Sequence, residues 1–96
     1  MNDTFYFLMA NLGSEVARLF RARDEHNTER LLGAYERSCQ ILKEVQMLQS
    51  EKENVRELSL LQDVLDDAVR AHPQFSVRVE SLREYFMPFA LRVLNP

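Results

Sequence analysis

The chain is poor in residues that break helices and in residues that cross-link small domains. Its 96 residues include two glycines, three prolines, one cysteine and two histidines, with no tryptophan. So few turn-forming residues exclude the many tight turns of an all-β fold. The lone cysteine, Cys39, excludes an internal disulfide and a zinc site built from several cysteines. We therefore expect the fold to depend on buried apolar side chains.

Long apolar runs are missing as well. No stretch approaches the ~20 residues that a membrane-spanning helix needs. Asn2 and Asp3 precede the short apolar segment Phe5–Met9, where a secretory signal would carry lysine or arginine. We therefore expect a cytoplasmic protein with no membrane partner.

Basic residues are outnumbered by acidic ones. Twelve lysines and arginines stand against 15 aspartates and glutamates, so the net charge is −3. A nucleic-acid-binding domain usually presents a basic face, which this balance does not favour. Ten of the basic residues are arginines, however. A subunit of a nucleic-acid-associated assembly stays an alternative function, with a patch formed by Arg18, Arg21, Arg23 and Arg30.

Helical periodicity is the strongest feature that is present. Apolar residues make up 46% of the chain and charged residues 28%, as in a folded globular domain. The apolar residues recur at spacings of three and four in four segments, which is typical of amphipathic helices. The predicted core positions are Phe5, Leu8, Leu12, Val16 and Leu19; Leu31, Tyr35, Cys39, Leu42, Val45 and Leu48; Val55, Leu58, Leu61, Leu65 and Ala68; and Val79, Leu82, Phe86, Phe89 and Val93. We predict one all-α domain over residues 1–96, an up-down-up-down four-helix bundle.

Local signals separate the first three predicted helices. Asn27 or Thr28 can cap the second helix. Ser50–Glu53 fits a capping box, which predicts a new helix start and a break between the second and third helices. Because neither glycine nor proline lies between Gly33 and Pro73, one continuous rod is the alternative.

Prolines delimit the last helix. His72-Pro73 ends the third helix, because the residue before proline is pushed out of helical geometry. Ser76 is a candidate cap for the fourth helix. Pro88 removes one backbone hydrogen bond within that helix, which predicts a kink or a restart there.

Both ends of the chain carry more apolar residues than one helix stripe requires. Segments 5–9 and 85–91 cover more than one helix face, so the excess should lie on the surface or meet another chain. Small residues on the first helix, including Gly13, allow another helix to approach closely. Packing within the chain is the favoured interpretation of these small residues, and a dimer seam is the alternative. The predicted interaction surface is Phe5, Phe7, Met9, Ala10, Gly13, Ser14, Ala17, Tyr85, Met87, Phe89 and Leu91.

A polar row lies beside the small residues of the first helix. Asn11, Glu15 and Arg18 follow one another at spacings of four and three. A glutamate and an arginine three apart commonly form a weak surface pair. A polar ligand pocket or an interface network is the alternative.

Acidic residues gather on the third predicted helix. Asp63, Asp66 and Asp67 could suggest a metal site, but carboxylate-bridged di-iron bundles use Glu-x-x-His pairs and neither histidine has a glutamate three positions before it. A solvated acidic face is therefore expected. Cys39 lies on a core stripe, where cysteine behaves as a small hydrophobic residue.

Arg21 and His26 match the loose Arg-x(4–6)-His element of HEPN-domain ribonucleases, which are also small helical bundles. The resemblance implies an RNA-cleaving or toxin–antitoxin-type domain in which the arginine stabilises phosphate charge and the histidine transfers a proton. Ten arginines and two histidines make such a match common by chance. This reading is therefore kept as an alternative.

Two terminal segments resemble a known group. Residues 7–18, beginning Phe-Leu-Met-Ala-Asn-Leu-Gly-Ser-Glu-Val, and residues 82–91, Leu-Arg-Glu-Tyr-Phe-Met-Pro-Phe-Ala-Leu, are similar to the two ends of small uncharacterised bacterial helical-bundle proteins. The resemblance implies a bacterial, cytosolic origin and no particular activity. It also implies that the two segments lie together.

These observations favour a non-catalytic interaction module. We expect it to form a homodimer, or to dock a protein partner, through the first and fourth helices. No catalytic residue, cofactor or metal is expected, because the chain lacks a glycine-rich phosphate loop and the nucleophile and zinc-protease motifs.

Overall fold

The fold was obtained as a computed structural model, which describes residues 3–48, 55–71, 73–74 and 78–94. Four helices make up most of this part of the chain, and it contains no strand. The helices are α1 (Asp3–Asp24), α2 (Thr28–Leu48), α3 (Val55–Ala68) and α4 (Val79–Leu94). The all-α, four-helix prediction is confirmed.

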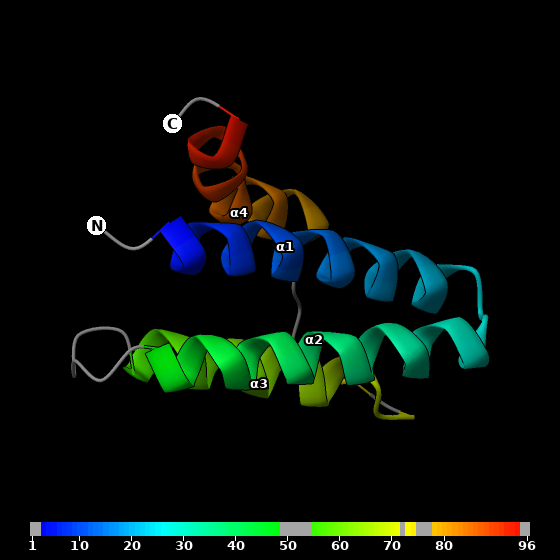
Figure 1. The fold of residues 1–96 in the computed structure, drawn as a ribbon. Helices are drawn as coiled ribbons and strands as arrows, with labels where there is room; N and C mark the ends of the chain where they lie inside the picture. Colours follow the sequence, from blue (N-terminus) through cyan, green and yellow to red (C-terminus); the bar gives the residue numbers. More distant parts are fainter. Residues whose placement is uncertain (1–2, 49–54, 72, 75–77, 95–96) are drawn as a thin grey trace.

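The helices are arranged around α1. Figure 1 shows α1 and α2 running antiparallel, α3 beside α2, and α4 crossing α1 on the side away from α2. α1 packs against the other three helices, whereas the backbone of α4 lies close to that of α1 alone among the described helices. The packing is that of a helical bundle. The up-down-up-down order is not confirmed, since α4 crosses α1 instead of lying alongside it.

The core lies mainly between α1, α2 and α3. It consists of Met9, Leu12, Val16, Leu19, Phe20, Ala34, Leu42, Val45, Leu58, Leu61, Leu65 and Ala68, with Phe86 added from α4. The predicted stripes of α1 and α3 are buried or packed against this core, apart from Val55, whose side chain lies outside the described set. Apolar burial of this kind contributes roughly 25 cal/mol per Å².

The predicted stripe of α2 is only partly correct. Leu42 and Val45 are buried, but Tyr35 and Cys39 are half-buried and Leu48 is exposed. Ala34 and Ser38 are buried although neither was predicted, because α2 packs against both α1 and α3 and therefore buries a wider arc than one stripe. The hydroxyl of Ser38 is enclosed without a hydrogen-bond partner among the described residues.

Helices α2 and α3 are separate, as the preferred prediction stated. The capping box at Ser50–Glu53, as well as His72 and Ser76, lies outside the described residues. Beyond α3, the backbone N–H of Gln74 donates to the Asp67 carboxylate at 2.8 Å. α4 continues through Pro88, so the predicted restart is wrong, while a kink there stays a prediction.

The turn between α1 and α2 has a defined cap on each side. The N–H of Asn27 donates to the carbonyl of Ala22, and that of His26 to the carbonyl of Arg23, which is the Schellman pattern of helix ends. The side-chain oxygen of Asn27 accepts from the N–H of Arg30 at 3.1 Å, so Asn27 caps α2 as predicted. His26 has φ 57°, in the left-handed region that favours glycine.

Replacing His26 by glycine is expected to stabilise the fold by about 1 kcal/mol, because the left-handed conformation costs a residue with a Cβ roughly 1–2 kcal/mol. The side chain of His26 is exposed, so little packing is lost. Urea unfolding of the wild type, His26→Gly and His26→Ala measures the effect. A lower stability of His26→Gly than of His26→Ala would contradict this account of the turn.

Candidate functional site

α4 packs against the small residues of α1. A Cβ built on Gly13 would lie 2.8 Å from both Cβ and Cγ of Phe86, so the glycine allows the two helices to touch at this point. Phe86 is only 6% exposed and is the residue of α4 that joins the core. Packing within the chain, the favoured interpretation of the small residues, is therefore what the structure shows.

An open apolar groove of about 230 Å³ runs along the contact between α1 and α4. Its α1 wall includes Ala10, Gly13, Ser14 and Ala17, the four small residues expected from the sequence. Its α4 wall includes Leu82, Phe86, Met87 and Ala90. The small-residue face of α1 and the apolar segment of α4 therefore lie together.

Aromatic rings join the start of α1 to the second half of α4. The Phe5 and Phe89 rings meet edge to face with centroids 5.9 Å apart, and the Tyr6 and Phe89 rings lie 6.3 Å apart at an angle of 37°. Such pairs add about 0.5–1.5 kcal/mol each beyond their area. The guanidinium of Arg92 lies 5.1 Å from the centroid of the Tyr6 ring. Each of these two segments therefore covers part of the apolar surface of the other.

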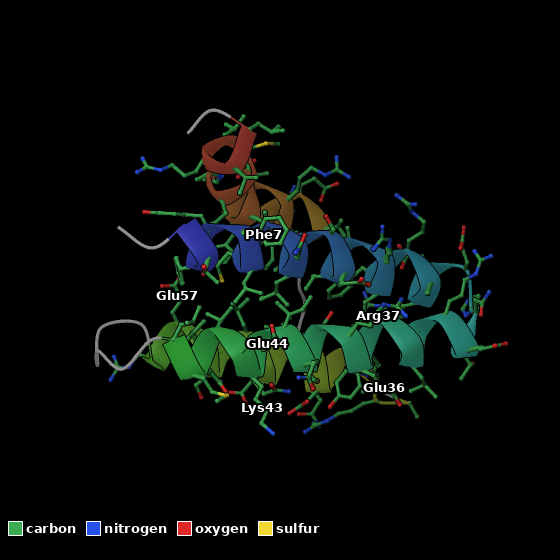
Figure 2. The ribbon with its side chains drawn as sticks, viewed as in Figure 1. Phe7, Glu36, Arg37, Lys43, Glu44 and Glu57 are labelled. Atoms are coloured by element: carbon green, nitrogen blue, oxygen red, sulfur yellow. The ribbon has the colours of Figure 1, made fainter. Side chains whose placement is uncertain are left out.

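Several apolar side chains near this contact still face solvent. Phe7 is 55% exposed and lies on α1 where α4 crosses it (Figure 2). On α4, Met87, Leu91 and Leu94 are 46%, 50% and 74% exposed. These three follow one another at spacings of four and three, so they form one row along the helix. We call Met87, Leu91 and Leu94 the α4 stripe.

The predicted interaction residues therefore divide into two sets. Met9 is 1% exposed and belongs to the core, while Phe5, Tyr85 and Phe89 pack against it. The predicted apolar excess therefore does not include Met9, which the core encloses, and the ring contacts between α1 and α4 and within α4 partly cover Phe5, Tyr85 and Phe89. The accessible set is Phe7, Ser14, Ala17, Met87 and Leu91, with Ala10 and Gly13 half-buried in the groove.

Two tyrosines are tied to carboxylates on α3. The Tyr35 hydroxyl donates to Oδ1 of Asp66 at 2.6 Å, and this bond, with burial, raises the pKa of Tyr35. Burial and a hydrogen bond to Glu57 raise the pKa of Tyr85 on α4. Both tyrosines therefore stay protonated throughout the physiological range, as hydrogen-bond donors.

The acidic residues of α3 are not simply a solvated face. Asp63 is exposed as predicted, but Asp66 also accepts from Nε2 of Gln62 at 2.9 Å, and Asp67 is 4% exposed. Asp66 holds α3 to α2, and Asp67 receives the chain beyond α3, so the expectation is corrected for these two. The same Gln62 amide lies 3.5 Å from Sγ of Cys39, which is half-buried instead of fully enclosed. Among the described residues, no group of three histidine, cysteine or acidic side chains could hold a metal ion.

Glu15 connects two arginines from different helices. It pairs with Arg18 at 3.1 Å, as the spacing predicted, and also with Arg37 of α2 at 3.0 Å. Arg37 was missed, although positions 15 and 37 are equidistant from the turn at His26, a signal that would have found it. Asn11, the third member of the predicted row, is exposed.

The other predicted arginines differ in their surroundings. The guanidinium of Arg23 lies 4.6 Å from the centre of the Phe20 ring. Arg21 and Arg30 line a polar groove together with Arg18 and Arg37. His26 is not among the groove residues, and no hydrogen bond joins it to Arg21 within the described ranges. The RNA-cleaving alternative stays an untested prediction.

The described helices include none long and apolar enough to cross a membrane. Comparison of the chain with family models, curated proteins and solved structures found no match.

Proposed function

We propose that this protein is a non-catalytic interaction module that forms a homodimer through α4 and the adjoining half of α1. The observation that carries the proposal is the α4 stripe, in which Met87, Leu91 and Leu94 are between 46% and 74% exposed. A cytoplasmic, bacterial setting, as expected from the sequence, is part of the same proposal.

The position of α4 supports this choice of surface. Because the backbone of α4 lies close to α1 alone among the described helices, no other described helix packs along its outer face. Phe7 and the groove beside Gly13 extend the apolar surface from α4 onto α1. Contiguous apolar surface of this kind typically marks an interaction site.

A second copy of the chain fits a surface of this shape. A row of apolar residues along one helix is self-complementary about a two-fold axis, the commonest symmetry of soluble oligomers. An axis passing between Met87 and Leu91 would bring Met87 of each copy against Leu91 of the other. Each symmetric contact would then be made twice.

Substituting Leu91 by glutamate is expected to weaken dimerisation about 100-fold or more, because each buried leucine contributes about 1.5–3 kcal/mol and two are lost per dimer. Sedimentation velocity from low to high micromolar concentration measures the effect. The matched control is Leu60→Glu on α3, where the leucine is 59% exposed and the helix has no backbone contact with α4. The control should dimerise like the wild type.

A wild type that sediments as a monomer at every concentration would overturn the homodimer proposal. Equal weakening by Leu91→Glu and Leu60→Glu would show that the α4 stripe is not the interface.

A further inference from the structure

We propose that the polar groove between the end of α1 and the start of α2 is a binding site for a small phosphate-bearing ligand. The groove has a volume of about 330 Å³ and is distinct from the apolar groove beneath α4. Arg18 and Arg21 of α1 line it together with Arg30 and Arg37 of α2. The antiparallel turn between the two helices (Figure 1) places side by side the segments that carry these four arginines.

Positive charges outnumber negative ones among the residues that line the groove. Glu15 binds Arg18 through Oε2 and Arg37 through Oε1, which uses both of its oxygens. Arg21 and Arg30 have no carboxylate within ion-pair distance in the part of the chain that the structure describes. Counting Glu15 and Glu25 against the four arginines leaves two positive charges (4 − 2). A phosphate monoester carries close to two negative charges at neutral pH and would neutralise them.

Each arginine that Glu15 binds is oriented by one ion pair, while 62% of the Arg18 side chain and 55% of the Arg37 side chain stay exposed. The side chain of Glu15 is only 13% exposed, and Figure 2 shows Arg37 between α1 and α2. The Arg37 guanidinium lies over Gly33, where an added Cβ would be 3.3 Å from Nη1. An arginine that is already engaged in an ion pair loses less freedom when it binds, and its planar fork matches two phosphate oxygens.

The surroundings favour a small ligand over a long polyanion. Asp24, Glu25 and Glu29 are all exposed at the same turn, so carboxylates flank the arginines. A nucleic-acid strand that continued past the groove would meet Asp24 and Glu29 in addition to Glu25, whereas a compact phosphate group would meet only Glu25, which lines the groove. The groove volume is at the lower end of the range for small-ligand sites.

Isothermal titration with sodium pyrophosphate at low ionic strength tests the site. Arg21→Gln/Arg30→Gln is expected to weaken binding about tenfold or more, because hydrogen bonds to a charged partner are lost. The matched control, Arg56→Gln/Arg78→Gln, removes two exposed arginines from α3 and from the start of α4. It should bind like the wild type, and binding should weaken as salt is added.

A further variant distinguishes a preformed binding site from a surface that is merely basic. Gly33→Val leaves the charge unchanged but adds atoms beneath the Arg37 guanidinium, so it should weaken pyrophosphate binding several-fold. Absence of saturable binding to the wild type, or equal losses in the two double variants, would overturn the proposal. Tighter binding of a single-stranded RNA, lost in Arg21→Gln/Arg30→Gln, would assign the groove to nucleic acid instead.

Discussion

Replacing Gly13 by valine is expected to displace α4 from α1 and to lower the free energy of unfolding by about 3 kcal/mol. This value is at the upper end of the usual destabilisation caused by overpacking. The added Cβ would lie 2.8 Å from Cβ and Cγ of Phe86. These atoms lie close to the α4 backbone, so the clash is relieved only if the whole helix moves. Moving it withdraws Phe86 from the core and disturbs the aromatic contacts between Phe5 and Phe89.

The second glycine of the chain is the matched control for this variant. A Cβ on Gly33 would meet only the end of the flexible Arg37 side chain, so Gly33→Val should change stability by less than about 0.5 kcal/mol. Urea unfolding compares the two variants with the wild type, and size-exclusion chromatography follows dimerisation. Equal stabilities of Gly13→Val and Gly33→Val would show that close contact at Gly13 does not hold α4.

Truncating Phe20 to alanine is expected to cost about 3–5 kcal/mol, the range for removing a buried aromatic ring. Phe20 is 2% exposed and is the largest fully buried side chain among the described residues. The Arg23 guanidinium lies 4.6 Å from the centroid of its ring, and Phe20 also lines the groove between α1 and α4. Native domains have about 5–15 kcal/mol of stability in all, so this variant should unfold at a markedly lower temperature.

Phe7→Ala is the matched variant on the same helix, because its ring is 55% exposed. It should change the thermal midpoint of the monomer little and weaken dimerisation, whereas Phe20→Ala should do the reverse at low protein concentration. Scanning calorimetry and sedimentation velocity together separate the two effects. A large loss of monomer stability in Phe7→Ala would contradict the assignment of this ring to the surface.

The terminal apolar segments show what the number of apolar residues in a segment can predict about its exposure. Their richness correctly indicated that some of their side chains stay exposed. It could not say which ones, because burial depends on where two helices cross. Met9 joins the core, while Phe7, two residues away, faces solvent.

Helix stripes depend on interactions within three or four residues. For that reason the sequence alone determined the four helices, a cap at Asn27 or Thr28, and the core faces of α1 and α3. Tertiary packing decided the rest: the crossing of α4 over Gly13, the burial of Ala34 and Ser38, and the pairing of Glu15 with Arg37. These features join residues far apart in the chain. They follow from the shapes and distances of facing helices, which no local pattern encodes.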